Sequence, residues 1–593
     1  MIILGINEDH NGTAALIKDG EVIACASEER FSRIKNDTEY PKQAIDSILI
    51  STGIKPAQID YVAFAGKYID PLQMSIKRLT RYKIGDYINE MHEYWHKILI
   101  DKTQSSYYHD LLKEKRFSDK SGIYYDYSFM KDTPEDKWGE CMNTMRCKMV
   151  KEHLGAAAEK VSFVDHHTGH AYYAYYASPR DNKGKVAIVT ADGWGDGCNA
   201  TISVIENNSI KEIHRTAMCN MARMYRWTTL LLGMKPNEHE YKVMGLAPYT
   251  KDYLRKPAYE VYKETLVVDG LDFKWNKKPS DMYFYFREKF EGMRFDGISA
   301  GIQLWLEEIL ITWISNVMRH TGAEVLYYSG GLSMNVKANK VLAELPIIKG
   351  FYVSPSGGDE SLAIGAAFVL AKEKGEQPKT LKHAYLGYAP TVEESIAVVA
   401  PFRNDKRFLV IDNPSNEMLA GFLAESKVLG RCVGNMEFGA RSLGNRAILC
   451  DPSKHDNLRL INEKIKFRDF WMPFTPSILK ERSSDYLVNP KNLNAEYMTI
   501  AFESTLKARK DLQAAIHPYD FTVRPQLVSK ETNKEYYELL KAFEAISGIG
   551  GVLNTSLNLH GFPIVRTAQD AIETFINSGL DGMILPKILI LKK

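Results

Sequence analysis

Two stretches of the chain alternate apolar and polar positions in the same order, and each predicts a run of strands. The first, IILGINEDHNGTAALIKDGEVIACASEE (residues 2–29), reads as strand, polar turn, strand, Asp-Gly hairpin and strand. The second, VAIVTADGWGDGCNATISVIENNSIKEIHRT (residues 186–216), has an acidic glycine-rich turn and an Asn-Asn hairpin at the matching places. Helical sequence follows each unit, so the pattern predicts a duplicated α/β domain. Two unrelated strand meanders are the alternative.

The intervening segments have the spacing of helices. PKQAIDSILISTGI (residues 41–54) begins with proline and repeats its apolar positions near the helical period of about 3.6 residues. SAGIQLWLEEILITWISNVMRH (residues 299–320) predicts a long, mostly buried helix. EVLYYSGGLSMNVKANK (residues 324–340) then predicts a strand, a Gly-Gly turn and a helix.

The Gly-Gly turn is a candidate nucleotide site. Backbone amides beside Gly330, Gly331 and Asn335 are suited to a close approach by phosphate, with tight packing of the turn as the alternative. SPSGGDESLAIGAAFVLAKEKG (residues 354–375) repeats the pattern and places Asp359 at a helix start. An acidic residue there also stabilises a helix without any further function.

Two less regular segments suggest how the chain divides. Residues 70–160 are rich in Tyr, Lys, Asp and Met without clear periodicity, and we interpret them as a mostly helical insertion. KEKGEQPKTLKH (residues 372–383) is polar and is the expected linker. Because single cores stop growing near about 250–300 residues, we expect one domain over 1–371 and a second over 384–593.

Composition excludes several classes of protein. The chain is 45% hydrophobic and 25% charged with a net charge of +2, so no global field favours a nucleic acid or a membrane as partner. The seven cysteines form no CxxC pair, which argues against a disulfide framework or a cysteine zinc site. The N-terminus turns polar after six residues and no apolar run has membrane length. A cytoplasmic protein is expected.

Three histidines gather in DHHTGH, residues 165–170. His166 and His170 are four residues apart, so a helix would place both on one face, where they could bind a metal. The glutamate of the HExxH protease signature is absent. A polar turn of hydrogen-bonded histidines is therefore an equal alternative, and His167 would face elsewhere.

The second half carries cations among glycine, aromatic and proline residues. Guanidinium and ammonium groups beside hydroxyl and amide donors are suited to a compact phosphate, although each charge alone is more often a solvated surface group. The candidates are Arg441, Arg446, Lys464, Lys466, Arg468, Arg524, Asn554, Thr555, Ser556 and Asn558.

Taken together, these motifs resemble the O-carbamoyltransferases of nodulation-factor and antibiotic biosynthesis. The matching stretches, in family order, are DHNGTAAL, HHTGHA, YKVMGLAPY, SGGLSMN, GGDESLAIGAA, MEFGARSLGNR, KIKFRDFWMPF and LNTSLNLHGFPIV. The resemblance implies a duplicated actin-like (ASKHA) domain, like that of threonylcarbamoyl-transferring tRNA-modification enzymes, followed by a YrdC-like α/β domain. The second domain would make carbamoyl adenylate from carbamoyl phosphate and ATP, and the first would pass the carbamoyl group to a small-molecule hydroxyl.

The resemblance also implies roles for individual residues. His166, His170 and Asp359 match metal ligands, plausibly for iron, and Asp192 is a further candidate, either as ligand or at the phosphates. His10 matches the histidine beside the expected acceptor hydroxyl. ATP would bring Mg²⁺. The carbamoyl-phosphate pocket is matched by Arg441, Lys466, Arg468, Arg524, Asn554 and Ser556.

The chain departs from the family pattern at three positions. Met472 replaces a common arginine, Phe562 a glutamate and Leu557 a phenylalanine. Loss of the arginine would remove one phosphate contact, and Lys464 and Arg446 are the candidate substitutes for it. A threonylcarbamoyl-type tRNA-modifying enzyme, an actin-like sugar kinase and a non-catalytic scaffold are the rival functions. The acceptor and the oligomeric state are left open.

Overall fold

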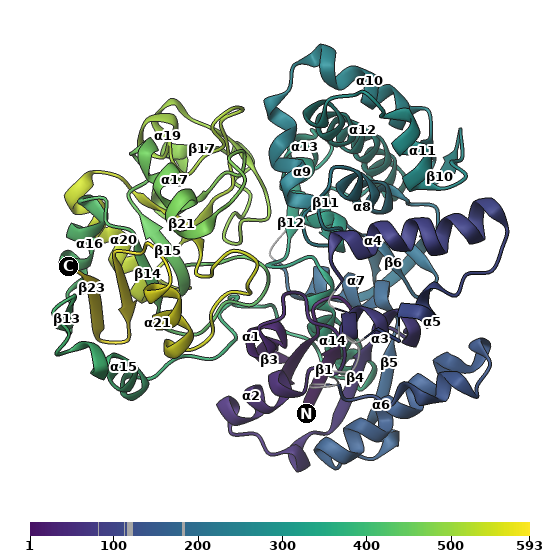
Figure 1. Cartoon of the computed structure of the whole chain (residues 1–593), viewed down its shortest axis with the longest axis horizontal. Helices are drawn as coiled ribbons and strands as arrows, with labels where there is room; N and C mark the ends of the chain where they lie inside the picture. Colours follow the sequence, from purple (N-terminus) through teal and green to yellow (C-terminus); the bar gives the residue numbers. More distant parts are fainter. Residues whose placement is uncertain (81, 112, 115–122, 181–183) are drawn as a thin grey trace.

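The first part of the chain contains two five-stranded sheets with one topology. The computed structural model describes residues 1–593 except 81, 112, 115–122 and 181–183 (Figure 1). In each sheet the first three strands are antiparallel and the last two continue parallel to the first, in the orders β3-β2-β1-β4-β5 and β8-β7-β6-β11-β12. The strands are β1 (Ile2–Asn7), β2 (Thr13–Lys18), β3 (Glu21–Ser27), β4 (Tyr61–Ala65), β5 (Val161–Val164), β6 (Val186–Gly195), β7 (Cys198–Glu206), β8 (Ser209–Thr216), β11 (Val325–Ser329) and β12 (Gly350–Val353). The predicted α/β duplication is confirmed, and we call the two sheets with their helices lobe 1 and lobe 2.

The hairpins form where the turn chemistry predicts them. Asp19 and Gly20 have φ of 51° and 75°, and Asn207 and Asn208 have φ of 49° and 58°. Both pairs thus adopt the left-handed conformations that two-residue hairpins require. The acidic turn is shorter than expected, because β6 continues through Gly195 and the chain reverses at 196–197.

The lobes differ in where long segments are inserted. In lobe 1 the insertion lies between β4 and β5, and its described residues are largely helical; in lobe 2 it lies between β8 and β11. The main helices of the first are α3 (Pro71–Thr80), α4 (Ile84–Glu90), the π-helix η2 (Met91–Asp101), α5 (Tyr107–Leu111) and α6 (Trp138–Leu154). Those of the second are α8 (Met221–Leu231), α9 (Glu240–Leu246), α10 (Asp252–Lys263), α11 (Met282–Lys289) and the long buried α12 (Phe295–Thr321).

Two helices cross between the lobes. The helix α7 (His166–Tyr176) follows the first sheet but packs on β6 and β11 of the second, whereas α14 (Leu362–Glu373) follows the second sheet and packs on β1 and β4 of the first. They touch at two glycines: a Cβ on Gly365 would lie 2.2 Å from the carbonyl oxygen of Gly169. This close crossing brings the N-terminal ends of both helices together between the sheets.

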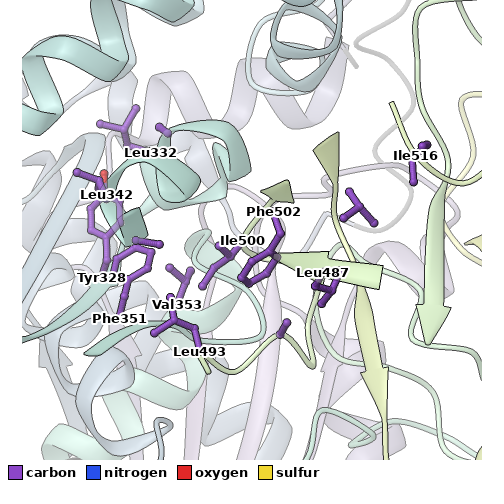
Figure 2. Close-up of a cluster of buried hydrophobic side chains, with 14 of the residues drawn as sticks. Tyr328, Leu332, Leu342, Phe351, Val353, Leu487, Leu493, Ile500, Phe502 and Ile516 are labelled. Carbon is purple, nitrogen blue, oxygen red and sulfur yellow. The ribbon is translucent and has the colours of Figure 1, made fainter. Parts of the chain in front are cut away.

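The C-terminal part is built on an eight-stranded mixed sheet in the order β13-β23-β22-β14-β15-β21-β16-β20. Its strands are β13 (Phe408–Asp412), β14 (Leu429–Cys432), β15 (Arg446–Cys450), β16 (Thr475–Leu479), β20 (Gln526–Val528), β21 (Gly551–Ser556), β22 (Gly582–Leu585) and β23 (Ile588–Lys592). Apolar side chains join it to lobe 2: Figure 2 shows Phe351 and Val353 beside Leu493 and Ile500 in one buried cluster. Among the described residues, no helix combines the length and apolarity needed to cross a membrane.

Candidate functional site

The histidine motif begins a helix, as its spacing predicts. Asp165 is the N-cap of α7, and its carboxylate accepts a hydrogen bond from the Thr168 amide (2.9 Å). Arg215 binds the same carboxylate through two nitrogens, at 3.0 and 2.9 Å. Burial raises the pKa of Asp165, but Arg215 and the Thr168 bonds outweigh it and lower that pKa to about 2. The carboxylate therefore stays charged and fixes the helix start at His166.

The two histidines of that face meet two aspartates from other elements. His170 Nε2 lies 3.3 Å from Asp192 Oδ2 and 3.4 Å from Asp359 Oδ1, and the corresponding distances from His166 Nε2 are 3.9 and 3.8 Å. Asp192 belongs to β6, and Asp359 precedes α14. One ligand atom from each residue lies within 4.8 Å of the others. We call these four residues the histidine–aspartate cluster.

The donor set of the cluster fits a divalent cation. Both histidine Nε2 atoms are buried and have no hydrogen-bond partner within the described chain. The other imidazole nitrogen of His170 lies 3.2 Å from Ser329 Oγ, which orients the ring. Two imidazole nitrogens and two carboxylate oxygens are ligands that Zn²⁺ and Fe²⁺ accept.

The carboxylates of the cluster have opposite pKa shifts. Burial raises the pKa of Asp192, but the two histidines outweigh it and hold that pKa well below its usual range. The pKa of Asp359 is raised well above its ordinary value by burial and then by the Asp192 charge. Burial lowers the pKa of His166, yet Asp192 and Asp359 more than offset this and raise it. A bound cation would relieve the repulsion between the two carboxylates.

The Gly-Gly turn contacts a member of the cluster directly. The Gly331 amide donates to Asp192 Oδ2 at 2.7 Å, and a Cβ on Gly330 would lie 2.3 Å from the Ala191 carbonyl oxygen. The Asn335 side chain caps α13 (Val336–Glu344) and bonds to Gln303. The tight-packing alternative thus accounts for these three residues, and their binding of a nucleotide stays a prediction.

Two further histidines of the sequence motifs, His167 and His10, are not members of the histidine–aspartate cluster. His167 is buried on another side of α7, with Nδ1 2.7 Å from Thr190 Oγ1, and burial lowers its pKa to about 3. This matches the structural role expected for it. His10 is half-buried in the turn after β1, where its carbonyl oxygen accepts from Asn7 Nδ2 at 3.3 Å. The adjacent Asp9 contributes to the raised pKa of Asp359, so this turn borders the cluster.

A second site gathers positive charge in the C-terminal part. Three arginines, Arg441, Arg468 and Arg524, line one cavity, and we call it the arginine pocket. Within the part of the chain that the structure describes, none of the three guanidinium groups forms a salt bridge. Burial lowers the pKa of Arg441 to about 10, and burial with the other two charges lowers that of Arg524. The other lining residues are Ala440, Ser442, Pro473, Phe474, Thr475, Met498, Asn554, Thr555 and Ser556.

Lys466 and Asn554 support the wall of this pocket. Lys466 is only 2% exposed, and its ammonium group donates to Ser556 Oγ (3.1 Å) and Asn558 Oδ1 (2.6 Å). Burial and the neighbouring Arg468 hold its pKa well below the usual range. Asn554 is fully buried and donates to Ser442 O and Ser477 Oγ, so its side chain is occupied by the fold.

A contact between two loops connects the two sites. Gly439, two residues before Arg441, packs so closely on Ser356 that an added Cβ would lie 2.8 Å from the serine Cβ. Ser356 Oγ in turn donates to the carboxylate of Glu360, the neighbour of Asp359. The loop that carries Arg441 therefore rests on the loop that carries a member of the histidine–aspartate cluster.

Comparison with known proteins identifies the family. The family described as carbamoyltransferase N-terminus matches residues 2–368, and that described as carbamoyltransferase C-terminus matches residues 420–592. The chain belongs to the carbamoyltransferase family. The family assigns carbamoyl transfer to this chain, rather than the phosphoryl transfer of a sugar kinase or the role of a non-catalytic scaffold.

Relatives of this carbamoyltransferase span nearly its whole length. An uncharacterised protein of Methanocaldococcus jannaschii is 29% identical over 100% of both chains, and another from that organism is 30% identical over 95% of both. Nodulation protein NolNO of Sinorhizobium fredii is 28% identical over 98% of this chain and 79% of its own.

Two of the three positions that depart from the family pattern, Met472 and Leu557, are next in sequence to the pocket-lining residues Pro473 and Ser556. Met472 is buried against α9, where its sulfur would lie 3.2 Å from a Cβ on Gly245. Neither suggested substitute faces the pocket: Arg446 donates to carbonyl oxygens, including that of Tyr388 at 2.8 Å, and Lys464 is exposed. Phe562 is 50% exposed and Leu557 is fully buried. The structure thus supplies no replacement for the missing arginine among these candidates.

Sequence reasoning missed two groups in this carbamoyltransferase. Burial lowers the pKa values of Arg441 and Arg468, and Tyr241 of α9 partly offsets this lowering, so Tyr241 lies beside the arginine pocket although it comes from lobe 2. Asp196 accepts the backbone N–H of His166 at 2.7 Å. The motif DGWGDG contains both Asp192 and Asp196, so the second aspartate was visible as a candidate, but its backbone partners were not.

Proposed function

We propose that this carbamoyltransferase is an ATP-dependent O-carbamoyltransferase in which the arginine pocket and the histidine–aspartate cluster divide the work. The observation that carries the proposal is that one chain of this family holds three uncompensated guanidinium groups around one cavity and a separate cluster of cation ligands. The first suits anions and the second suits a metal.

The arginine pocket would form carbamoyl adenylate in a YrdC-like domain. Carbamoyl phosphate, ATP and water would give carbamoyl adenylate, phosphate and pyrophosphate. Arg441, Arg468 and Arg524 would bind the phosphate oxygens, because planar guanidinium groups bind them in pairs of hydrogen bonds. Lys466 and Ser556, already bonded to each other, would complete the wall.

The carbamoyl group would then be transferred to the acceptor at the turn that carries His10, beside the histidine–aspartate cluster. The acceptor oxygen forms a bond to the carbamoyl carbon, the bond from that carbon to the adenylate oxygen breaks, and AMP leaves. His10 would take the hydroxyl proton as the oxygen attacks. His166, His170, Asp192 and Asp359 would hold Fe²⁺ or a similar ion, which supplies Lewis-acid polarisation of the carbonyl.

A small hydroxylated natural product is the acceptor class that we infer. The relatives include nodulation proteins, and the motifs of this chain resemble the carbamoyltransferases of nodulation-factor and antibiotic biosynthesis, a resemblance that implies a small-molecule hydroxyl as acceptor. The net charge of +2 offers no strong basic surface for a tRNA, which disfavours the threonylcarbamoyl-type alternative.

The test is adenylate formation without any acceptor. Purified protein with ATP and carbamoyl phosphate should release pyrophosphate and accumulate carbamoyl adenylate, detected by mass spectrometry. Arg441→Gln should reduce both products, and Arg407→Gln, at an exposed arginine, is the matched control. Pyrophosphate release that does not depend on carbamoyl phosphate would refute the proposal.

A further inference from the structure

The segment Gly66–Tyr68, which leaves β4 of lobe 1, shares the hydrogen-bond partner Arg146 with Glu8 of the His10 turn and the partner Asp196 with His166 of the histidine–aspartate cluster. Hydrogen bonds hold this segment from two sides, and neither set involves a residue to which the chemistry has been assigned. Asp196 binds its N–H groups and Arg146 binds a carbonyl oxygen. We call Gly66–Tyr68 the bridge segment.

Asp196 joins three backbone groups from both sides of the lobe boundary. It lies in the turn between β6 and β7 of lobe 2, with φ of 46°. Its carboxylate accepts from the N–H groups of Lys67 (3.0 Å) and Tyr68 (2.9 Å) in lobe 1 and of His166 (2.7 Å). His166 is the first residue of α7, where an N–H has no partner within the helix, so the carboxylate satisfies it at the positive end of the helix.

The same turn also positions the His166 ring. A Cβ added to Gly195 would lie 2.2 Å from Cγ of His166, so the imidazole rests directly on the glycine backbone. The residue pair 195–196 thus fixes both the main chain and the ring of one candidate ligand. A ligand whose backbone and ring are both held needs little reorganisation when an ion binds.

Arg146 of the insertion holds the bridge segment from the other side. Its guanidinium is fully buried and donates to the Gly66 carbonyl oxygen (3.0 Å) and to Glu8 Oε2 (2.7 Å). Glu8 is two residues from His10. Because breaking a buried ion pair leaves an uncompensated charge, this bracing is costly to undo.

We propose that Asp196 is a positioning residue that ties the geometry of His166 to the closure of lobe 1 on lobe 2 through the bridge segment. Separation of the lobes would break the hydrogen bonds from the Lys67 and Tyr68 N–H groups to Asp196. The Asp196 carboxylate, which also binds the His166 N–H, would then be less constrained. The metal-binding part of this inference rests on the proposed function. The hydrogen-bonding part does not.

Asp196→Asn is the variant that isolates this role. Asparagine adopts the left-handed conformation as readily as aspartate, so the turn is preserved while one acceptor oxygen becomes a donor. Asp281→Asn is a matched control, because the Asp281 carboxylate also accepts two backbone N–H bonds, from Tyr283 (2.8 Å) and Phe284 (2.9 Å), but at the start of α11.

The first measurement is Co²⁺ binding followed by the visible absorption of the ion. We expect the affinity of Asp196→Asn to fall about tenfold with a changed absorption band, as for other residues that orient metal ligands. Asp281→Asn should match the wild type. Equal affinity and an identical spectrum in Asp196→Asn would overturn the positioning role.

The second measurement is amide hydrogen exchange in the metal-free protein. Peptides that contain residues 66–68 and 165–167 should both exchange faster in Asp196→Asn and at wild-type rates in Asp281→Asn. Wild-type exchange in both peptides would refute the link between the lobes. If wild-type protein bound no Co²⁺, the metal role of the proposed function would fail, and the exchange experiment would still decide the role of Asp196.

Discussion

The histidine–aspartate cluster and the arginine pocket are both buried concentrations of charge, but the protein balances them differently. In the cluster, imidazoles lie beside carboxylates, and the repulsion that persists is between Asp192 and Asp359. In the pocket, the charges of Arg441, Arg468 and Arg524 all have one sign, and after burial the other two arginines lower the pKa of Arg524 further. Burial of like charges is costly without a partner, so we expect each site to bind a ligand that offsets its excess charge.

The construction of the two sites differs as well. The cluster depends on the crossing of two helices at Gly169 and Gly365, so its members are positioned by a close backbone contact between lobes 1 and 2. The pocket is lined by loops and strand ends of the C-terminal part and borders α9 of lobe 2. If the two sites act in sequence, damage to one should spare the other.

The strongest test of this separation is the double variant His166→Ala/His170→Ala. It removes both imidazole ligands, so carbamoylation of hydroxylated small molecules should fall by more than the roughly 100-fold typical of changes around a metal ligand. Pyrophosphate release dependent on carbamoyl phosphate should persist. A mass increase of one carbamoyl group on an acceptor panel reports transfer. Loss of both activities together would show that the sites are not separable.

His10→Asn addresses the transfer side without touching a metal ligand. Asparagine keeps a hydrogen-bonding side chain but cannot take a proton near neutral pH. Transfer should therefore slow by about 10²–10⁴-fold, the usual contribution of a general base, while carbamoyl adenylate accumulates. Quenched-flow sampling with mass spectrometry would follow the intermediate. Wild-type transfer rates would assign the proton to another group.

Arg441→Gln addresses the anion side. A charge-assisted hydrogen bond contributes about 1.5–3 kcal/mol, so the Michaelis constant for carbamoyl phosphate should rise by roughly 10–100-fold. Co²⁺ binding at the histidine–aspartate cluster should not change. Arg407→Gln again serves as the control. An unchanged Michaelis constant would remove Arg441 from the pocket.

Local patterns predicted more of this molecule than long-range ones. The strand units, the hairpins at 19–20 and 207–208 and the helix under His166 and His170 follow from residues close in sequence, and the structure contains all of them. The position of Asp359 beside these histidines depends on the helix crossing and came only from family resemblance. Asp196 binds backbone N–H groups that are far apart in sequence, at Lys67 in one part of the chain and at His166 in another, and no side-chain pattern marks such partners.

The two sites should also respond to pH with opposite signs. Metal binding requires neutral imidazoles, and the pKa of His166 is raised, so protons compete with the metal and Co²⁺ affinity should increase as pH rises from 6 to 8. The pocket requires protonated cations. The pKa of Lys466 is lowered by burial, so its charge is present below that pKa and is lost as pH rises through it, whereas Arg441, with a pKa of about 10, stays charged. Pyrophosphate affinity should therefore decrease with pH, by up to about tenfold per unit for one linked proton.

Isothermal titration of Co²⁺ and of pyrophosphate at several pH values would measure both trends on the same protein. Lys466→Met keeps the buried volume and removes the titrating group, so it should flatten the pyrophosphate profile and leave the Co²⁺ profile unchanged. Parallel pH trends for the two ligands would mean that one ionisation governs both sites. Opposite pH trends for the two ligands, with only the pyrophosphate profile flattened in Lys466→Met, would show that different ionisations govern the two sites.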